Sequence, residues 1–216
     1  MHSQLIILPI LFQALIAVIL LFLWSKPRTQ RVVSILGSGA SVVISAFLFS
    51  QVWNNGIQTM QLGNWEPPFG ISLVADTFAV VLVLLTSVVG FAVSIYSSTN
   101  VVSSRVKFGY YAMFHFLLMG LTGAFLTGDI FNLYVWFEVI IISSFVLLTI
   151  GGRKAQLEGA VKYFTLNMLA SIVFLTAIAM LYGVTGSLNM AELSQIIPTI
   201  ENKGLVSTIS LIFFIG

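Results

Sequence analysis

Residues 127–138 have the sequence TGDIFNLYVWFE and lead into an apolar run that continues to Ile150. This pattern predicts a membrane-spanning helix that starts just after Asp129. Glu138 follows Asp129 by nine residues, which is about 13.5 Å along a helix. Because the hydrocarbon core of a bilayer is ~30 Å thick, that depth is close to the midplane. An ionisable side chain at the midplane is costly, and it indicates an ion or proton path.

The composition predicts an all-α polytopic membrane protein. Hydrophobic residues make up 58% of the 216 residues and charged residues only 7%, where a soluble domain has roughly 25% charged residues. Each stretch without charge is long enough to cross a bilayer, and none shows the alternation of an outer-membrane barrel. These stretches are residues 1–25, 32–65, 77–104 and 163–191. We therefore expect a multi-pass protein of the cell membrane, surrounded by the lipid bilayer.

Several classes of function have no support in the sequence. The chain has no cysteine and only two histidines, His2 and His115, so we expect no cysteine-ligated cluster, no zinc site and no cofactor. The formal net charge is only +2. Without a dense cluster of basic residues, nucleic-acid binding is not expected.

The apolar segments predict six complete spans and the start of a seventh. Residues 1–108 would hold the first three spans, and residues 109–216 the fourth to sixth and the truncated seventh. A polar loop at residues 53–70 contains Glu66 and the turn-forming pair Pro67-Pro68. The predicted spans are residues 5–23, 32–52, 71–96, 108–127, 130–150, 160–184 and 205–216.

The distribution of basic residues predicts the orientation. When alternate linkers are assigned to opposite sides, only Lys203 lies on one side. By the positive-inside rule the other side is cytoplasmic, which places the N-terminus outside. The basic residues on the cytoplasmic side are Lys26, Arg28, Arg31, Arg105, Lys107, Arg153, Lys154 and Lys162.

Glu138 is the leading candidate for chemistry. A protonated carboxyl could serve only for helix packing, although glutamine would pack as well without the cost of ionisation. The functional interpretation is a carboxyl whose charge follows a passing cation, so that it takes up and releases protons. Desolvation favours the neutral form of such a group and a nearby ammonium group favours the charged form.

Four other residues have two interpretations each. His115, in the fourth span, could relay protons to Glu138 or donate a hydrogen bond to a backbone carbonyl as a neutral ring. Lys162, at the start of the sixth span, could deliver charge or extend its ammonium to the lipid headgroups. Asp129 and Asp76 are better placed to cap the fifth and third helices than to carry protons.

Residues 115–120 (HFLLMG) and 123–138 (GAFLTGDIFNLYVWFE) resemble the D subunit of Mrp-type multisubunit Na⁺(cation)/H⁺ antiporters. Residues 64–71 (NWEPPFGI) and 162–164 (KYF) support the resemblance. Residues 128–133 (GDIFNL), with Phe137-Glu138, separate this chain from the more distant antiporter-like subunits of complex I, with which it shares a broader family, but not from the equivalent subunit of membrane-bound hydrogenases. The resemblance implies inverted helical repeats and matches Glu138 to a fifth-helix glutamate that pairs with a seventh-helix lysine. Since the sequence stops at Gly216, before such a lysine, we expect the N-terminal part of a longer product.

The resulting prediction is a proton-translocating transporter subunit, not an enzyme. Its expected partners are other membrane subunits of an antiporter complex, protons and Na⁺. One alternative is the homologous subunit of a redox-driven complex, such as a membrane-bound hydrogenase or a complex I relative. The other alternative is a scaffold subunit that transports nothing.

Overall fold

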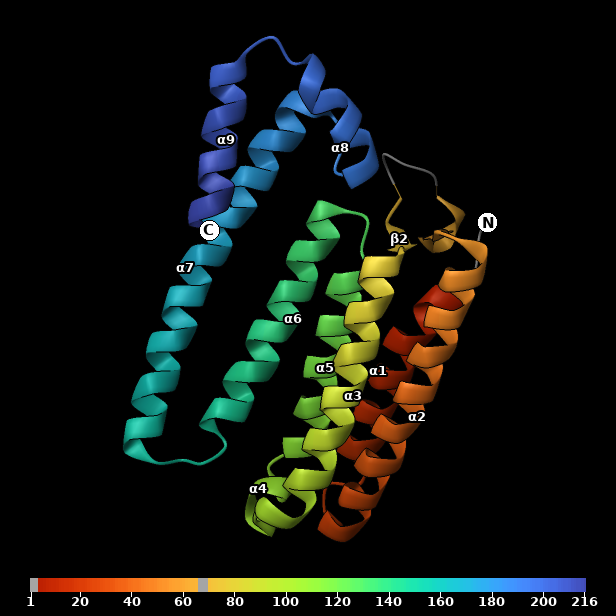
Figure 1. The fold of residues 1–216 in the computed structure, drawn as a ribbon. Coiled ribbons are helices and arrows are strands. Elements are labelled where there is room, and N and C mark those ends of the chain that lie inside the picture. Colours follow the sequence, from red (N-terminus) through yellow and green to blue (C-terminus); the bar gives the residue numbers. More distant parts are fainter. Residues whose placement is uncertain (1–3, 66–69) are drawn as a thin grey trace.

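The computed structural model describes residues 4–65 and 70–216, and most of these are helical (Figure 1). The predicted turn at Pro67-Pro68 and Glu66 lie outside the described residues. The longer helices are α1 (Leu8–Phe22), α2 (Pro27–Asn55), α3 (Thr77–Asn100), α5 (Tyr110–Leu126), α6 (Ile130–Thr149), α7 (Lys154–Thr185) and α9 (Lys203–Ile215). The short helices are α4 (Ser103–Lys107), α8 (Met190–Ile196) and the 3-10 turns η1 (Gln4–Ile7), η2 (Leu62–Asn64) and η3 (Ile197–Thr199), and the strands are β1 (Gln58–Gln61) and β2 (Ser72–Ala75).

The structure confirms a polytopic helical membrane protein. Among the described residues, five helices are long and apolar enough to cross a bilayer: α1 together with η1, α2, α3, α6 and α7. The fourth predicted span is shorter than expected, because α5 has 17 residues. The preceding residues turn through α4 and through Gly109, whose φ of 88° is left-handed and suits glycine.

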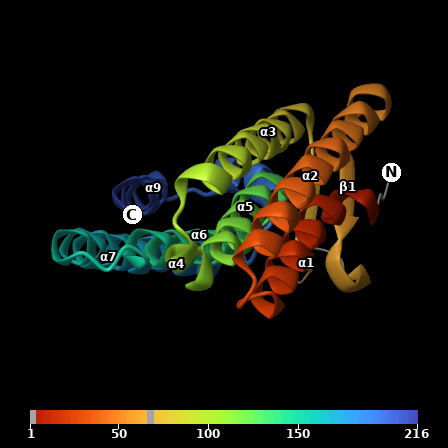
Figure 2. The ribbon, with the colours of Figure 1, turned by 90° about the horizontal axis from the view of Figure 1, so that it is seen from below.

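The helices form a bundle with an extension on one side. Helices α1, α2, α3 and α5 pack together, and α6 packs against α5. Helix α7 packs against α6, and α9 packs against α7, on the side of the molecule farthest from α1 and α2 (Figure 2). Few side chains of α6 and α7 are buried, so much of their surface is left uncovered by the described residues.

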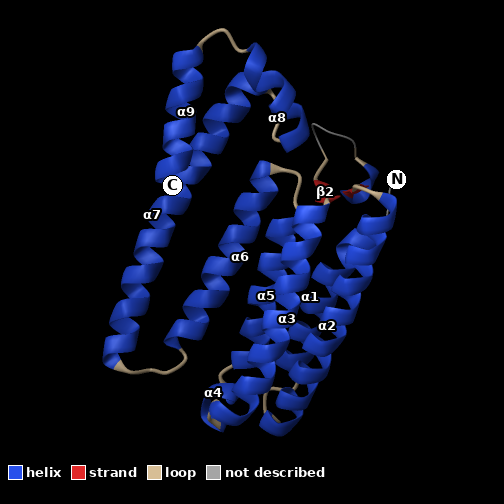
Figure 3. Cartoon of the chain, in the orientation of Figure 1, coloured by secondary structure: helices blue, strands red, loops and turns tan. Residues whose placement is uncertain are grey.

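The connections between helices gather at two opposite ends (Figure 3). The hairpin end carries β1, β2, α8 and the start of α9 with Lys203. The basic end carries the α1–α2 connection, α4 and the α6–α7 connection, which include or adjoin seven of the eight basic residues predicted to share one side. The eighth, Lys162, lies about two turns into α7 from this end. Successive linkers therefore lie at opposite ends of the molecule, as the prediction of orientation from the basic residues assumed.

Of the predicted third span, residues 71–96, the helix covers only the part after Asp76, the residue interpreted above as its cap. Residues 72–75 form β2, which pairs antiparallel with β1 from Gln58↔Ala75 to Gln61↔Ser72. Leu73 also bridges to Thr127, at the end of α5. The pairing satisfies the backbone groups of this segment, and the helix begins only after Asp76.

Two apolar clusters hold the bundle together. One, near the hairpin end, joins η1, α1, α2, β2, α3 and α5 and includes Ile10 and Leu126. The other, near the basic end, includes Ile16 and Ala112. Along α1, Gln13 lies between Ile10 and Ile16, and along α5, His115 lies between Ala112 and Leu126. A polar layer therefore separates the two apolar clusters.

Candidate functional site

Glu138 lies in the interface between α6 and α7. Its side chain is half-buried, and its Oε1 atom accepts a hydrogen bond from the hydroxyl of Ser171, near the middle of the 32-residue α7. Both helices are long and apolar enough to cross a membrane. The depth inferred from sequence therefore corresponds to a contact between the central parts of two candidate spans.

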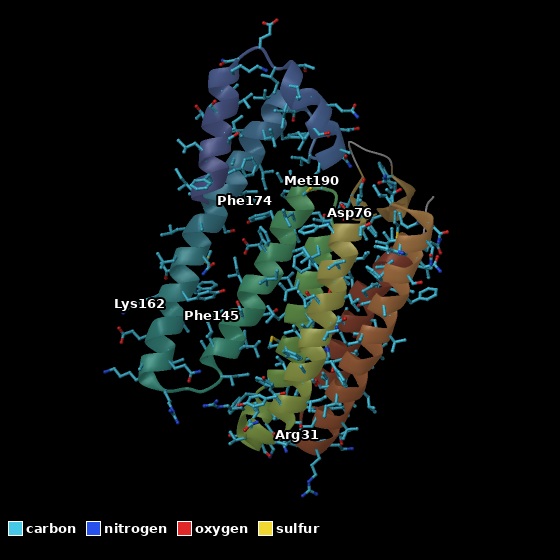
Figure 4. All side chains as sticks on the ribbon, in the orientation of Figure 1. Arg31, Asp76, Phe145, Lys162, Phe174 and Met190 are labelled. Atoms are coloured by element: carbon cyan, nitrogen blue, oxygen red, sulfur yellow. The ribbon has the colours of Figure 1, made fainter. Side chains whose placement is uncertain are left out.

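Aromatic side chains hold α6 and α7 on either side of this contact. The rings of Phe145 and Phe164 have centroids 4.7 Å apart, and those of Phe137 and Phe174 are 5.9 Å apart. Phe145 and Phe174 both lie along the α6–α7 interface (Figure 4). Such tilted pairs contribute about 0.5–1.5 kcal/mol each beyond the burial of their area.

A cavity of about 320 Å³ lies beside the Glu138–Ser171 contact, among α6, α7 and α9. Its polar lining comes from Tyr134 on α6 and from Tyr163, Asn167 and Ser171 on α7, and the remaining lining is mainly aromatic and aliphatic. A water needs only ~10–15 Å³ of such space. The cavity is therefore roomy enough for several waters beside Ser171.

Three polar residues of α7 follow one another along this cavity. Tyr163, Asn167 and Ser171 have four-residue spacing, which puts them on one helix face. The Tyr163 hydroxyl is 3.0 Å from Ser144 Oγ on α6, and Asn167 Nδ2 donates to the Tyr163 carbonyl at 2.7 Å. The sequence analysis missed these residues, although polar side chains at helical spacing in an apolar segment are a signal that could have found them.

Lys162 does not contact Glu138. Its ammonium pairs with Glu158 at 2.7 Å, and the two side chains are 71% and 62% exposed. Nine residues separate Lys162 from Ser171, which at ~100° per residue puts them on opposite faces of α7. The structure therefore places Lys162 on the surface of the described chain, away from the α6–α7 contact.

His115 lies in a different environment, inside the bundle. Its side chain is fully buried, with Nδ1 2.6 Å from Gln13 Oε1 on α1 and Nε2 3.0 Å from Ser34 Oγ on α2. Ser34 Oγ is also 3.0 Å from Ser94 Oγ on α3. Since an amide oxygen only accepts, Nδ1 carries the hydrogen in this arrangement.

The His115 network continues away from Glu138. Gln13 Nε2 donates to Ser41 Oγ at 3.0 Å, and Ser41 donates to the Gly37 carbonyl. These partners come from α1, α2 and α3. Among the described residues, no hydrogen bond joins this network to Glu138, so the structure does not bring the two candidates together.

Asp129 and Asp76 lie at helix N-termini. Asp129 Oδ1 accepts from the Asn132 N–H at 2.8 Å at the start of α6, and Asp76 Oδ1 accepts from the Ala79 N–H at 2.7 Å at the start of α3. Burial raises the pKa of the Asp129 carboxyl above its ordinary value, and the backbone N–H groups of Asn132 and Phe131 oppose that rise. The cap fixes where α6 begins, and with it the position of Glu138.

Two glycines let α5 approach α6 closely. A Cβ atom on Gly120 would lie 2.8 Å from Ile140 Cγ1, and one on Gly123 would overlap the indole ring of Trp136. Trp136 is two residues from Glu138 on α6. The close approach of α5 therefore fixes the position of the part of α6 that carries the carboxyl.

Among the described residues, no group of three or more histidine and carboxylate side chains could hold a metal ion. The chemistry that this arrangement offers is the uptake and release of a proton by a carboxyl, with hydroxyl, amide and cavity space beside it.

Comparison with known proteins agrees with the resemblance inferred from sequence. Residues 127–216 match the family model described as NADH:quinone oxidoreductase/Mrp antiporter, transmembrane. The D subunit of an Na(+)/H(+) antiporter from Alkalihalophilus pseudofirmus is 41% identical over 213 residues, which are 99% of this chain and 43% of that protein. This chain thus spans less than half the length of the curated relatives that it matches.

Solved structures share the fold over nearly all of this chain. A chain of an archaeal membrane-bound sulfane sulfur reductase, a respiratory membrane complex, is 29% identical with a TM-score of 0.87, over 98% of this chain and 42% of that one. A chain of the Mrp complex from Dietzia sp. DQ12-45-1b is 23% identical with a TM-score of 0.84, and the match covers 98% of this chain and 40% of that one. Over nearly its whole length this chain is therefore similar to part of the D subunits of Na(+)/H(+) antiporters, and its residues 127–216 match the NADH:quinone oxidoreductase/Mrp antiporter family model.

Proposed function

We propose that this chain is part of a proton-translocating subunit of a cation/proton antiporter complex, and that Glu138 carries the proton. The observation that carries the proposal is the carboxyl itself, held by Ser171 where the central parts of two apolar helices meet. A carboxyl is costly at that depth, whereas an amide could make the same packing contact without ionising. The relatives named as Na(+)/H(+) antiporter subunits supply the substrate class, protons and Na⁺.

The proposed mechanism is alternation of Glu138 between two charge states. The neutral carboxyl suits the apolar surroundings, and the carboxylate is stabilised when hydrogen-bond donors or a cation lie beside it. The Ser171 hydroxyl is one such donor within this chain. The membrane potential supplies about 2.3 kcal/mol per charge for each 100 mV, which is enough to drive proton uptake from one side.

The proposal includes an orientation and a count of crossings. The chain would cross the membrane six times and begin a seventh crossing, with α5 as the fourth span. The basic end would face the cytoplasm and the N-terminus the outside of the plasma membrane, because eight of the nine basic residues are at or near that end. Partners would be other membrane subunits that cover the exposed faces of α6 and α7.

The test is Glu138→Gln in the full-length subunit, assembled with its partner subunits. We expect cation-dependent proton flux in inverted membrane vesicles to be abolished while the complex still assembles, because glutamine keeps the shape and loses the titratable proton. Glu158→Gln, an exposed carboxylate on α7, is the matched control and should transport normally. Wild-type flux in Glu138→Gln would instead favour the non-transporting scaffold.

A second candidate function follows from the archaeal respiratory complex, whose chain is 29% identical. The subunit would then pump protons in a complex driven by a redox reaction. Purification of the assembled complex distinguishes the two candidates. Co-purifying subunits that contain iron–sulfur clusters would favour the redox complex, and their absence would favour the antiporter.

A further inference from the structure

We propose that a cavity between α4 and the α6–α7 connection binds the phosphate of an anionic phospholipid headgroup, with Arg105 as its main contact. The volume of the cavity is about 470 Å³, which is within the range of about 300–1,000 Å³ of ligand sites. Ser104, Arg105 and Phe108 line one wall, and residues 149–152 line the other. The cavity lies at the basic end, where α4 comes beside the end of α6 (Figure 1, Figure 2). Glu138 has no part in this site, which goes beyond the proposed function.

The guanidinium of Arg105 is free to bind a ligand. Arg105 is half-buried and lines the cavity, and among the described residues its side chain has no hydrogen bond and no ion pair. Arg31, also at the basic end, differs because its guanidinium donates to the Val101 carbonyl at 2.8 Å. A guanidinium carries five N–H donors in a planar fork that matches the oxygens of a phosphate. An unpaired fork that lines open space is suited to an anion.

The carbonyls near the end of α6, on the opposite wall, already have partners within their own segment. The Thr149 hydroxyl donates to two of them, and Gln156 Nε2 and the Gly152 N–H donate to two more. None of these carbonyls is bonded to Arg105. The acceptors that a helix end exposes are thus occupied, and the donors of Arg105 are left for a ligand.

The charge around the cavity favours an anion. Lys107 lies two residues after Arg105, Arg153 and Lys154 directly follow the opposite wall, and all three are exposed. The acidic residue nearest to them in sequence is Glu158, whose carboxylate is already paired. Four basic side chains therefore line or flank an opening that, within the described part of the chain, no carboxylate lines. Basic pockets between membrane helices are sites for the headgroups of anionic lipids.

Exposed aromatic side chains point to a lipid as the source of the phosphate. Phe108 lines the cavity and is 67% exposed. The exposed Trp24 lies beside it, since a Cβ atom on Gly109 would be 3.2 Å from the Trp24 ring. Aromatic rings gather where lipid headgroups meet the acyl chains. A phospholipid would place its glycerol and the start of its acyl chains against these rings, whereas a free phosphate ion would leave them bare.

The proposed contacts divide into hydrogen bonds and charge. Arg105 would donate two parallel N–H bonds to phosphate oxygens. The Ser104 hydroxyl, which lines the same wall and has no hydrogen-bond partner among the described residues, would donate a third. Lys107 and Lys154 would act as point charges at the rim.

The test uses the full-length subunit within its purified complex, in detergent, with Phe108 replaced by the photoreactive p-benzoylphenylalanine. Because Phe108 is largely exposed, the replacement keeps an aromatic ring at the cavity without disturbing a packed core. Phosphatidylglycerol is added in increasing concentration, and mass spectrometry measures the lipid adduct on the peptide that contains position 108. We expect labelling that saturates. Phosphatidylcholine, whose choline meets the basic side chains, should need a concentration at least about tenfold higher.

Variants identify the contact. Arg105→Gln should raise the phosphatidylglycerol concentration for half-maximal labelling by about tenfold or more, the range for loss of a hydrogen bond to a charged group. Arg105→Lys, which keeps the charge and loses the planar fork, should fall between the wild type and Arg105→Gln. Arg28→Gln removes an exposed base of α2 that does not line the cavity, and it should label like the wild type. Inorganic phosphate at the same concentration as the lipid should not reduce labelling.

Other outcomes would overturn the site. Equal labelling by the two lipids would refute an anion site, and unchanged half-saturation in both Arg105 variants would refute the role of Arg105. Displacement of the lipid by inorganic phosphate would identify a site for the free ion instead. An adduct with protein in place of lipid would show that another part of the complex fills the cavity, which also refutes the proposal. Glu138→Gln should label like the wild type, so the lipid site and the proposed function can fail separately.

Discussion

The hydroxyl of Ser171 donates a hydrogen bond to Oε1 of Glu138, and this bond joins α7 to α6 near the middle of both helices. A carboxyl at this depth needs a donor when it is charged, and here the donor comes from a neighbouring helix. The position of α7 relative to α6 therefore decides whether this donor reaches the carboxyl of Glu138.

Shortening the carboxyl should weaken transport without removing the titratable group. Glu138→Asp withdraws the carboxyl from α7 by about 1.5 Å, one C–C bond length, and breaks its hydrogen bond to Ser171. We expect proton flux in vesicles between that of the wild type and that of Glu138→Gln. Glu158→Asp is the control, and full activity in Glu138→Asp would show that the Ser171 bond is dispensable.

Lys162 should contribute little to transport. Its ion pair with Glu158 is exposed and lies on the face of α7 opposite Ser171, and exposed pairs at this spacing contribute about 0.3–0.5 kcal/mol. We expect Lys162→Gln to assemble and to transport at nearly the wild-type rate. A large loss of flux with normal assembly would return Lys162 to the proton path.

His115 should matter for stability more than for transport. His115→Leu leaves Gln13 Oε1 without its buried partner, while Ser34 keeps its contact with Ser94. An unpaired buried acceptor costs about 1–3 kcal/mol. The thermal midpoint of the purified complex should fall, while flux per assembled complex stays normal. The double variant with Gln13→Leu should lose less stability than the sum of the two single variants, because both remove the same bond.

An outcome that would contradict this role is a His115→Leu complex of normal thermal stability with little proton flux. That result would place the imidazole in the proton path despite its separation from Glu138.

Gly123 should be sensitive to a single methyl group. Gly123→Ala places its Cβ atom in the indole ring of Trp136, and such overpacking typically costs about 1–3 kcal/mol. A lower thermal midpoint of the purified complex is expected. Gly183→Ala, in α7, meets no atom within 4 Å and should be neutral or slightly stabilising, so equal losses in both variants would refute the packing argument.

Asp129 should make stability depend on pH. Because burial raises its pKa in the folded protein, the folded state binds the proton more tightly than the unfolded chain does. This contribution is complete below the ordinary carboxyl range and is lost as pH rises through the raised pKa.

Asp129→Asn keeps an N-cap acceptor and cannot ionise. The thermal midpoint of the variant should equal that of the wild type at about pH 3, below the ordinary range of carboxyl titration, and exceed it at about pH 8, above that range. Asp76→Asn, at the N-cap of α3, is the control. A difference between Asp129→Asn and wild type that stays constant with pH would contradict the prediction.

Parts of the fold and of the site could be predicted from local sequence. The span that carries Glu138, the start of α6 after Asp129 and the grouping of basic residues depend on apolar runs, cap residues and charge, which are local properties. Residues 72–75 were included in the predicted third span because a short apolar run fits a strand as well as the start of a helix, and pairing with β1 decided between them. The partners of His115 come from α1 and α2, up to 102 positions away, and no local pattern identifies them.

The sequence by itself determined that this is a helical membrane protein with a carboxyl deep in an apolar segment, because hydrophobic length and the cost of buried charge are properties of each segment alone. The tertiary structure decided which side chains meet that carboxyl. It placed Ser171 against Glu138, and put Lys162 on the outer surface and His115 inside a separate bundle. The physical reason is that a helix fixes the spacing of its own side chains but not its rotation against a neighbour, which is set by packing such as that of Gly123 on Trp136 and Phe145 on Phe164.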